Sequence, residues 1–354
     1  MHELVIVLSD LYLPPAGEAG EARHPLPPGL EHVARFASRV RLDAGWRNWV
    51  AGWLGAQSAG NVGRFAAATV AARPVLPIAA QSAADRAVNA SVWLAEPVHL
   101  LTGLTSLHLE RRALLRLAPD ELAALASDFR TVFEGGAYEL LPLATGNFLL
   151  LGPQVTQMTT AEPARCFGAD ISAGMPHGPE AGPLRRLSTE VQMWLHDHAI
   201  NRARSACGEP PVNALWFWGE GAVSAVPAAQ AAFVLAAGTL AFGCDAFLAG
   251  LYARTGAEVL TLPAQLDGVF SYPRAQRAVL VLDVGQVLRS NSQWTLGDAL
   301  AQIDLRFIAP AVQSLRAGRL RTLIVIANDW QLSLTARDRL KRWRRRLPGL
   351  GGLQ

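Results

Sequence analysis

Short apolar runs of strand length recur along this chain, and segments with helical periodicity separate them. The runs cover residues 4–8, 147–151, 214–218, 258–262, 279–282 and 323–327. Most have an uninterrupted apolar centre, which is typical of strands that are covered on both faces. Strands of this kind, alternating with helices, form parallel sheets. We therefore predict an α/β fold in which a mostly parallel sheet is flanked by helices.

Helix signals lie between these runs. The predicted helices cover residues 30–40, 119–133, 184–207 and 295–315. The second begins at Pro119, with Asp120 and Glu121 in its first turn, where negative charge stabilises a helix. The third stops before Gly208 and the fourth before Gly318, as expected of helix ends.

Residues 102–185 differ from their flanks. They combine one helix, a turn at residues 133–136, a strand pair within 138–151, and Pro- and Gly-rich chain up to Pro183. We predict a smaller inserted α+β subdomain at 102–185 and a discontinuous α/β core made of 1–101 and 186–354. The Pro-rich segment 14–28 follows the first strand and is predicted to be a loop. A loop that covers a ligand and a plain surface loop are both open interpretations.

Charge and composition exclude several classes of protein. The chain of 354 residues has a net charge of +3, but residues 337–346 alone carry seven positive charges and one negative charge. The basic balance therefore belongs to one terminal segment, which argues against a dedicated nucleic-acid-binding protein.

Residues 221–244 are uncharged but rich in Ala and interrupted by Pro227, so we interpret them as a buried segment rather than a membrane span. Three scattered cysteines and the lack of a basic, signal-like N-terminus predict a cytoplasmic protein.

The stretch 190–221 is the densest in candidate functional residues. His196 and His198 are two residues apart, so on one helix they would point about 200° from each other and could not chelate one ion. Arginines near the end of the predicted helix suit its dipole, which is the structural interpretation. A strand that ends in glycines exposes backbone at a sheet edge, which favours a ligand-facing loop. The candidate ligand-binding residues are Asn201, Arg202, Arg204, Asn213, Trp218, Gly219 and Gly221.

The run HAINRARSACGEPPVNALWFWGEG (198–221) resembles a stretch of the bacterial RpfE-type regulatory proteins, which are distantly similar to archaeal cofactor-independent phosphoglycerate mutases. The resemblance extends over residues 10–14, 96–100, 117–121, 136–138 and 190–195. Ala199 and Glu220 depart from the family pattern, which has Pro and a small residue at these positions. The last third of the chain matches only loosely.

This resemblance implies an alkaline-phosphatase-like core. In active mutases two divalent metals, held by Asp and His, activate a Ser or Thr that takes up and returns a phosphoryl group. By analogy Asp10, Asp283 and Asp329 stand at metal-binding positions. All eight histidines lie at or before His198, so the imidazoles that accompany the late carboxylates are missing.

The leading hypothesis is a catalytically degenerate, phosphoglycerate-mutase-like regulatory pseudoenzyme without a cofactor. It would bind a small anionic, phosphorylated metabolite or a protein partner. The alternative is an active phosphomutase or phosphohydrolase that uses Asp10, Asp283 and Asp329 with Mg²⁺ or Mn²⁺. For each of these residues a third interpretation is open, because Asp just past a strand is often a helix cap or turn former.

Overall fold

The computed structural model describes residues 1–12, 25–56, 62, 66, 90–103, 107–222 and 234–338. The chain forms two compact units. Unit 1 contains residues 1–58, 234–244 and 258–354, and unit 2 contains residues 59–233 and 245–257. Most of the predicted loop 14–28 and most of the basic segment 337–346 lie outside the described residues.

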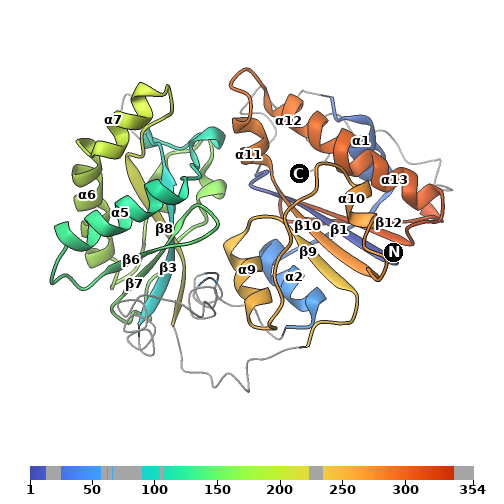
Figure 1. The fold of residues 1–354 in the computed structure, drawn as a ribbon, viewed down its shortest axis with the longest axis horizontal. Coiled ribbons are helices and arrows are strands. Elements are labelled where there is room, and N and C mark those ends of the chain that lie inside the picture. Colours follow the sequence, from blue (N-terminus) through green and yellow to red (C-terminus); the bar gives the residue numbers. More distant parts are fainter. Residues whose placement is uncertain are drawn as a thin grey trace. The chain divides into compact units, whose positions relative to one another are not determined.

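Unit 1 is built on a six-stranded sheet with the order β2-β12-β11-β1-β10-β9 (Figure 1). The strands are β1 (Glu3–Ser9), β2 (Ser38–Arg41), β9 (Thr239–Phe242), β10 (Arg277–Asp283), β11 (Thr322–Ala327) and β12 (Trp330–Thr335). The neighbours β9, β10, β1 and β11 run parallel, whereas β12 and β2 are antiparallel additions at one edge. The predicted α/β fold with a mostly parallel sheet is confirmed.

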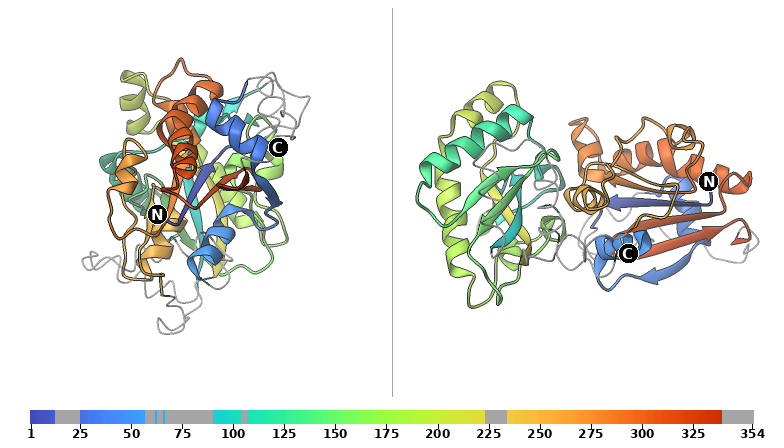
Figure 2. Two further views of the ribbon diagram at one scale, coloured as in Figure 1. Left: turned by 90° about the vertical axis from the view of Figure 1, so that its right-hand side faces the viewer. Right: turned by 60° about the horizontal axis from the view of Figure 1, so that its bottom comes forward.

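Helices cover both faces of this sheet. Leu4, Ile6 and Leu8 of β1 belong to a core that includes side chains of α1 (Pro28–Phe36), α12 (Leu296–Ile303) and α13 (Ala309–Arg316). Val5 and Val7 point to the opposite face and are also fully buried. On that face lies α2 (Gly45–Leu54) (Figures 1 and 2). Burial on both faces explains why the strands read as continuous apolar runs.

The predicted helix 295–315 is continuous but contains a π-helical turn, Asp304–Ile308. Pro310 has no N–H to donate to the Arg306 carbonyl, and that carbonyl instead accepts a hydrogen bond from the Leu266 N–H at 3.0 Å. The turn brings the buried Asp304 side chain to the start of α1. Its carboxylate accepts hydrogen bonds from the N–H groups of Gly29 (3.0 Å) and Leu30 (2.7 Å). It thereby caps a helix that has no side-chain cap of its own.

Unit 2 is built on a four-stranded antiparallel sheet with the order β6-β7-β3-β8. The strands are β3 (Ser91–Val98), β6 (Glu139–Pro142), β7 (Phe148–Gly152) and β8 (Ala214–Ala222). The helices α5 (Pro119–Val132) and α6 (Gly182–His196) pack on this sheet through an apolar core that contains Phe129, Phe148 and Leu187. The helix α7 (Ala199–Ala206) follows α6.

The boundaries of unit 2 differ from the predicted insertion 102–185. β3 and β8, which the sequence analysis assigned to the core, pair with each other and β3 also pairs with β7. These pairings join residues more than 50 positions apart, so local sequence patterns do not reveal them. The predicted strand pair within 138–151 is confirmed as β6 and β7.

Three local predictions differ from the structure. The predicted helix 184–207 is two helices, α6 and α7, which meet at Asp197 and His198. The predicted helix 30–40 ends at Phe36, and Ser38–Arg41 pairs with β12 instead. The predicted strand 258–262 makes one isolated bridge, between Leu260 and Phe242.

Shorter elements complete the described chain. They are β4 (Leu101–Thr102), β5 (Leu107–His108), α9 (Ala246–Ala253), α10 (Asp267–Phe270), α11 (Val284–Arg289) and the 3₁₀ turns Arg111–Ala113, Pro163–Cys166 and Ile171–Gly174. Within the ranges given above, no helix is long and apolar enough to cross a membrane.

Candidate functional site

The carboxyl edge of the parallel sheet in unit 1 gathers the three predicted metal-binding residues. β1 lies between β10 and β11, with Ser9 opposite Asp283 and Leu8 opposite Ala327. Asp10 follows β1, Asp283 ends β10, and Asp329 lies in the turn after β11. All three therefore stand at one edge, where open α/β folds bind their ligands.

The backbone turns sharply at this edge. Asp10 has φ 60° and Asn328 has φ 53°, and these are the two non-glycine residues with positive φ that the structure describes. Asp and Asn tolerate the left-handed conformation better than other residues with a side chain. The chain therefore leaves two neighbouring strands through the same uncommon conformation.

The carboxylate of Asp283 has two interactions of its own. Oδ1 accepts a hydrogen bond from the Gln286 N–H at 2.8 Å, which caps α11. Oδ2 lies 3.6 Å from a guanidinium nitrogen of Arg289, and both side chains are largely buried. Asp283 thus acts as a helix cap, as one of the interpretations predicted. Its carboxylate already has a positively charged side chain, that of Arg289, beside it.

The backbone of Asp329 forms a structural contact, because its carbonyl accepts a hydrogen bond from the Leu42 N–H at 2.7 Å. This bond attaches the chain after β2 to the turn between β11 and β12. Among the residues that the structure describes, no group of three or more His, Cys, Asp or Glu side chains is close enough to hold one metal ion.

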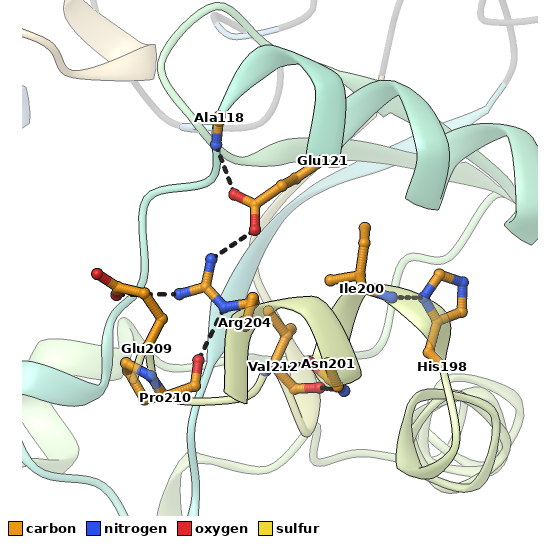
Figure 3. Close-up of polar contacts among 9 residues, drawn as sticks. All are labelled: Ala118, Glu121, His198, Ile200, Asn201, Arg204, Glu209, Pro210 and Val212. Atoms are coloured by element: carbon orange, nitrogen blue, oxygen red, sulfur yellow. Dashed lines mark hydrogen bonds and ion pairs between the residues drawn. The ribbon is translucent and has the colours of Figure 1, made fainter. Parts of the chain in front are cut away.

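The predicted ligand-binding residues belong to unit 2, where Asn201 joins α7 to the start of β8 (Figure 3). Its side-chain nitrogen donates to the carbonyls of Leu195 (2.7 Å) and Val212 (2.8 Å). Its oxygen accepts the Val212 N–H at 2.8 Å. The buried amide thus replaces a missing backbone pairing between helix and strand.

Arg204 links three segments of unit 2 and is 8% exposed (Figure 3). Its Nε donates to the Pro210 carbonyl at 2.8 Å, and Nη1 donates to the Glu121 carboxylate at 2.7 Å. Nη2 lies 3.7 Å from Glu209. Glu121 also accepts the Ala118 N–H at 2.8 Å, so one carboxylate serves the first turn of α5 and the end of α7. Glu121 could not be predicted as the partner of Arg204 from the sequence, because only the fold brings together positions 83 residues apart.

Asn213 and Arg202 also have structural contacts. Asn213 accepts the Leu100 N–H at 2.7 Å and donates to the Leu100 carbonyl at 2.8 Å, as a paired strand would. The exposed Arg202 donates to the Asp197 carbonyl at 2.7 Å, at the end of α6, where positive charge suits the helix dipole.

The remaining candidates lie in β8. Trp218 is buried, and the Gly221 backbone is paired with Val92 of β3. Gly219 has φ 69° and donates its N–H to Thr160 Oγ1 at 3.1 Å. The structure therefore divides the seven predicted residues between α7 and the strand β8 with its start, and gives most of them bonds within unit 2.

His196 and His198 lie on different elements. His198 is the N-cap residue of α7, and its Nδ1 accepts the Ile200 N–H at 3.2 Å (Figure 3). Its Nε2 lies 3.1 Å from Asp128, and its ring contacts Trp194 edge to face. His196 is exposed. The structure assigns His198 to the joint between α6 and α7.

Comparison with known proteins gives a distant similarity. No family model matches the chain. A 2,3-bisphosphoglycerate-independent phosphoglycerate mutase of Methanothrix thermoacetophila is 25% identical over 111 residues, which are 31% of this chain and 28% of that protein. The match thus spans less than a third of either chain.

Two solved structures are also similar. The cofactor-independent phosphoglycerate mutase from Thermoplasma acidophilum has a TM-score of 0.41 at 15% identity, covering 100% of this chain and 94% of that one. The PH0037 protein from Pyrococcus horikoshii has a TM-score of 0.45 at 14% identity, covering 94% and 87%. The chain thus has a distant similarity to the cofactor-independent phosphoglycerate mutases, carried by the sequence match to the Methanothrix enzyme.

Proposed function

We propose that this chain is a phosphoglycerate-mutase-like protein of the RpfE type, which binds a small phosphorylated metabolite without two-metal catalysis. The binding site is the carboxyl edge of β10, β1 and β11. A regulatory role follows, because a protein that binds a metabolite without converting it reports the concentration of that metabolite. A cytoplasmic location suits such a ligand.

The contact between Asp283 and Arg289 carries this proposal. The carboxylate at the mutase-like position caps α11 and has a guanidinium 3.6 Å away. A divalent ion there would lie beside a positive charge, which opposes its binding. Arg289, at the end of α11, places its guanidinium beside the end of β10, and a guanidinium suits a phosphate group because it offers several donors in one plane.

The histidine distribution supports the same proposal. In this sequence residues 199–354 contain no imidazole. Two adjacent divalent ions need many ligands, and carboxylates at three positions are few for that task. Loss of metal chemistry with retention of the strand-end geometry fits a binding protein.

Calorimetry on chelator-treated full-length protein tests this function. We expect 3-phosphoglycerate to bind without added metal, and Arg289→Gln to weaken binding about tenfold or more, since a charged hydrogen bond contributes about 1.5–3 kcal/mol. Arg321→Gln is the matched control, because Arg321 is exposed and immediately precedes β11, at its amino end. If 3-phosphoglycerate does not bind but a protein partner does, the ligand of this protein is that partner and not the metabolite.

An active metal-dependent phosphomutase or phosphohydrolase is the second candidate. Its supporting observation is the position of Asp10, Asp283 and Asp329 at the ends of three adjacent strands. It predicts turnover that Mg²⁺ or Mn²⁺ stimulates and that Asp10→Asn removes. Turnover that does not change in Asp10→Asn would refute this candidate.

A further inference from the structure

Unit 2 contains a cavity of about 380 Å³ between the end of α5 and the start of α6. Phe133 and Tyr138 line one side, from the turn that follows α5, and Leu187 lines the other side, from α6. Ligand sites for small molecules have volumes of about 300–1,000 Å³ and mostly apolar walls. This cavity is at the lower end of that range, so its ligand is small.

Three polar side chains also line the cavity. They are Tyr138, Arg186 and Glu190. Within the described chain, none of the three has a hydrogen bond or an ion pair with another residue. The arginine Arg204, by contrast, has three polar partners in the same unit. The cavity therefore combines an apolar floor with a cation, an anion and a hydroxyl group that are available to a ligand.

Arg186 lies where the helix dipole does not stabilise a positive charge. It lies near the N-terminus of α6, and no acidic residue occupies the first turn of that helix. A positive charge at a helix N-terminus opposes the helix dipole. Glu190 lies one helical turn later, and the order Arg before Glu is the less favourable one for a pair four residues apart. The two charges thus add little to the stability of α6 and are available to a ligand in the cavity.

The aromatic groups favour a ligand with a ring. Phe133 contacts Phe129 and Trp194, and Tyr138 contacts Trp93, so both rings are held in place by aromatic neighbours. Fixed rings offer faces and edges to an aromatic guest. Burial raises the pKa of the Tyr138 hydroxyl, which therefore stays protonated at neutral pH and can donate to a ligand.

We propose that this cavity binds a free aromatic α-amino acid. Its carboxylate pairs with Arg186, its ammonium group pairs with Glu190, and its ring packs against Phe133, Tyr138 and Leu187. Residues four apart on a helix have Cβ atoms about 5–6 Å apart, so their two charges can meet the two charges of one α-amino acid. The site lies in unit 2 and does not depend on the function proposed for the strand ends of unit 1.

Calorimetry on the full chain with L-phenylalanine tests this proposal. We expect binding at one site, weakened about ten- to 150-fold by Arg186→Gln. Arg185→Gln is the matched control, since Arg185 is exposed and adjacent on α6 but does not line the cavity. We expect this control to bind as the unchanged chain does.

Two analogues identify the ligand class. 3-Phenylpropionate lacks the ammonium group and phenethylamine lacks the carboxylate, so both should bind at least tenfold more weakly than L-phenylalanine. Glu190→Gln should weaken binding of L-phenylalanine and leave binding of 3-phenylpropionate unchanged. Circular dichroism confirms that each variant is folded.

Three results would overturn the proposal. They are the absence of binding at millimolar L-phenylalanine, equal loss in Arg185→Gln and Arg186→Gln, and analogues that bind as well as the amino acid. Each concerns unit 2 alone. Binding of 3-phosphoglycerate in the experiment above is a separate observation, so failure of one proposal is distinguishable from failure of the other.

Discussion

Removal of the Asp304 side chain should destabilise unit 1 strongly. Asp304→Ala leaves the buried N–H groups of Gly29 and Leu30 without their acceptor. A buried donor without a partner costs about 1–3 kcal/mol, so the two together predict a loss of about 2–6 kcal/mol in the free energy of unfolding. Asp304→Asn keeps one acceptor oxygen and should lose about half as much.

Urea unfolding followed by circular dichroism measures these losses. The pH dependence gives a second test of the same contact. Burial raises the pKa of the Asp304 carboxyl, although the bonds from Gly29 and Leu30 oppose this shift. The stability linked to a raised pKa is fully present below the unfolded value of about 3.9 and is lost as pH rises through the folded value.

Asn does not titrate. The free energy of unfolding of the unchanged chain should therefore exceed that of Asp304→Asn by a growing amount as pH falls from about 7 to about 4. Both proteins have the same other titrating groups, so the contributions of these groups cancel in the difference. An Asp304→Ala variant within about 0.5 kcal/mol of the unchanged chain, a typical surface effect, would refute the capping role. A difference in the free energy of unfolding that decreases on acidification would refute the assigned direction of the pKa shift.

Three further perturbations follow from the contacts described. Gly29→Ala should lower the unfolding midpoint in urea, because the added Cβ would lie 2.8 Å from the backbone nitrogen of Ala309; a midpoint equal to that of the unchanged chain would contradict this packing. Asn201→Ala removes three hydrogen bonds and should cost about 2–4 kcal/mol in urea unfolding, whereas a loss confined to ligand binding would favour a ligand role. Cys166 is buried and its thiol pKa is raised, so it should react with a thiol reagent far more slowly than the exposed Cys207; equal rates in single-cysteine variants would refute this.

The sequence predicted the elements whose signals are local. Continuous apolar runs predicted β1, β7, β8, β10 and β11, because strands buried on both faces need such runs. Pro119 with two acidic residues predicted the start of α5. These elements suffice for the α/β fold class.

Non-local pairing explains the rest. Edge strand β2 is mostly exposed and contains two arginines, so its sequence shows no apolar signal. The α6–α7 joint depends on the ring of His198 capping α7, and a histidine cap gives no usual sequence signature. The extent of unit 2 depends on β3, whose partners are remote in sequence.

The candidate site likewise contains positions that the sequence predicted and contacts that only the fold creates. Strand-end position alone suggested Asp10, Asp283 and Asp329, and parallel pairing in register brings their positions to one edge. Arg289 was missed, because its relation to Asp283 depends on how the short helix α11 turns back. Asn201 and Arg204 were predicted ligand-binding residues near the end of a helix, yet their bonds are those of a structural joint.

The most direct test of the central claim compares binding with turnover in one preparation. Chelator-treated full-length protein is given 3-phosphoglycerate with and without Mn²⁺, while heat of binding and formation of 2-phosphoglycerate are both followed. Our account predicts saturable binding that needs no metal and no product with Mn²⁺. Metal-dependent product formation that Asp10→Asn abolishes would contradict it.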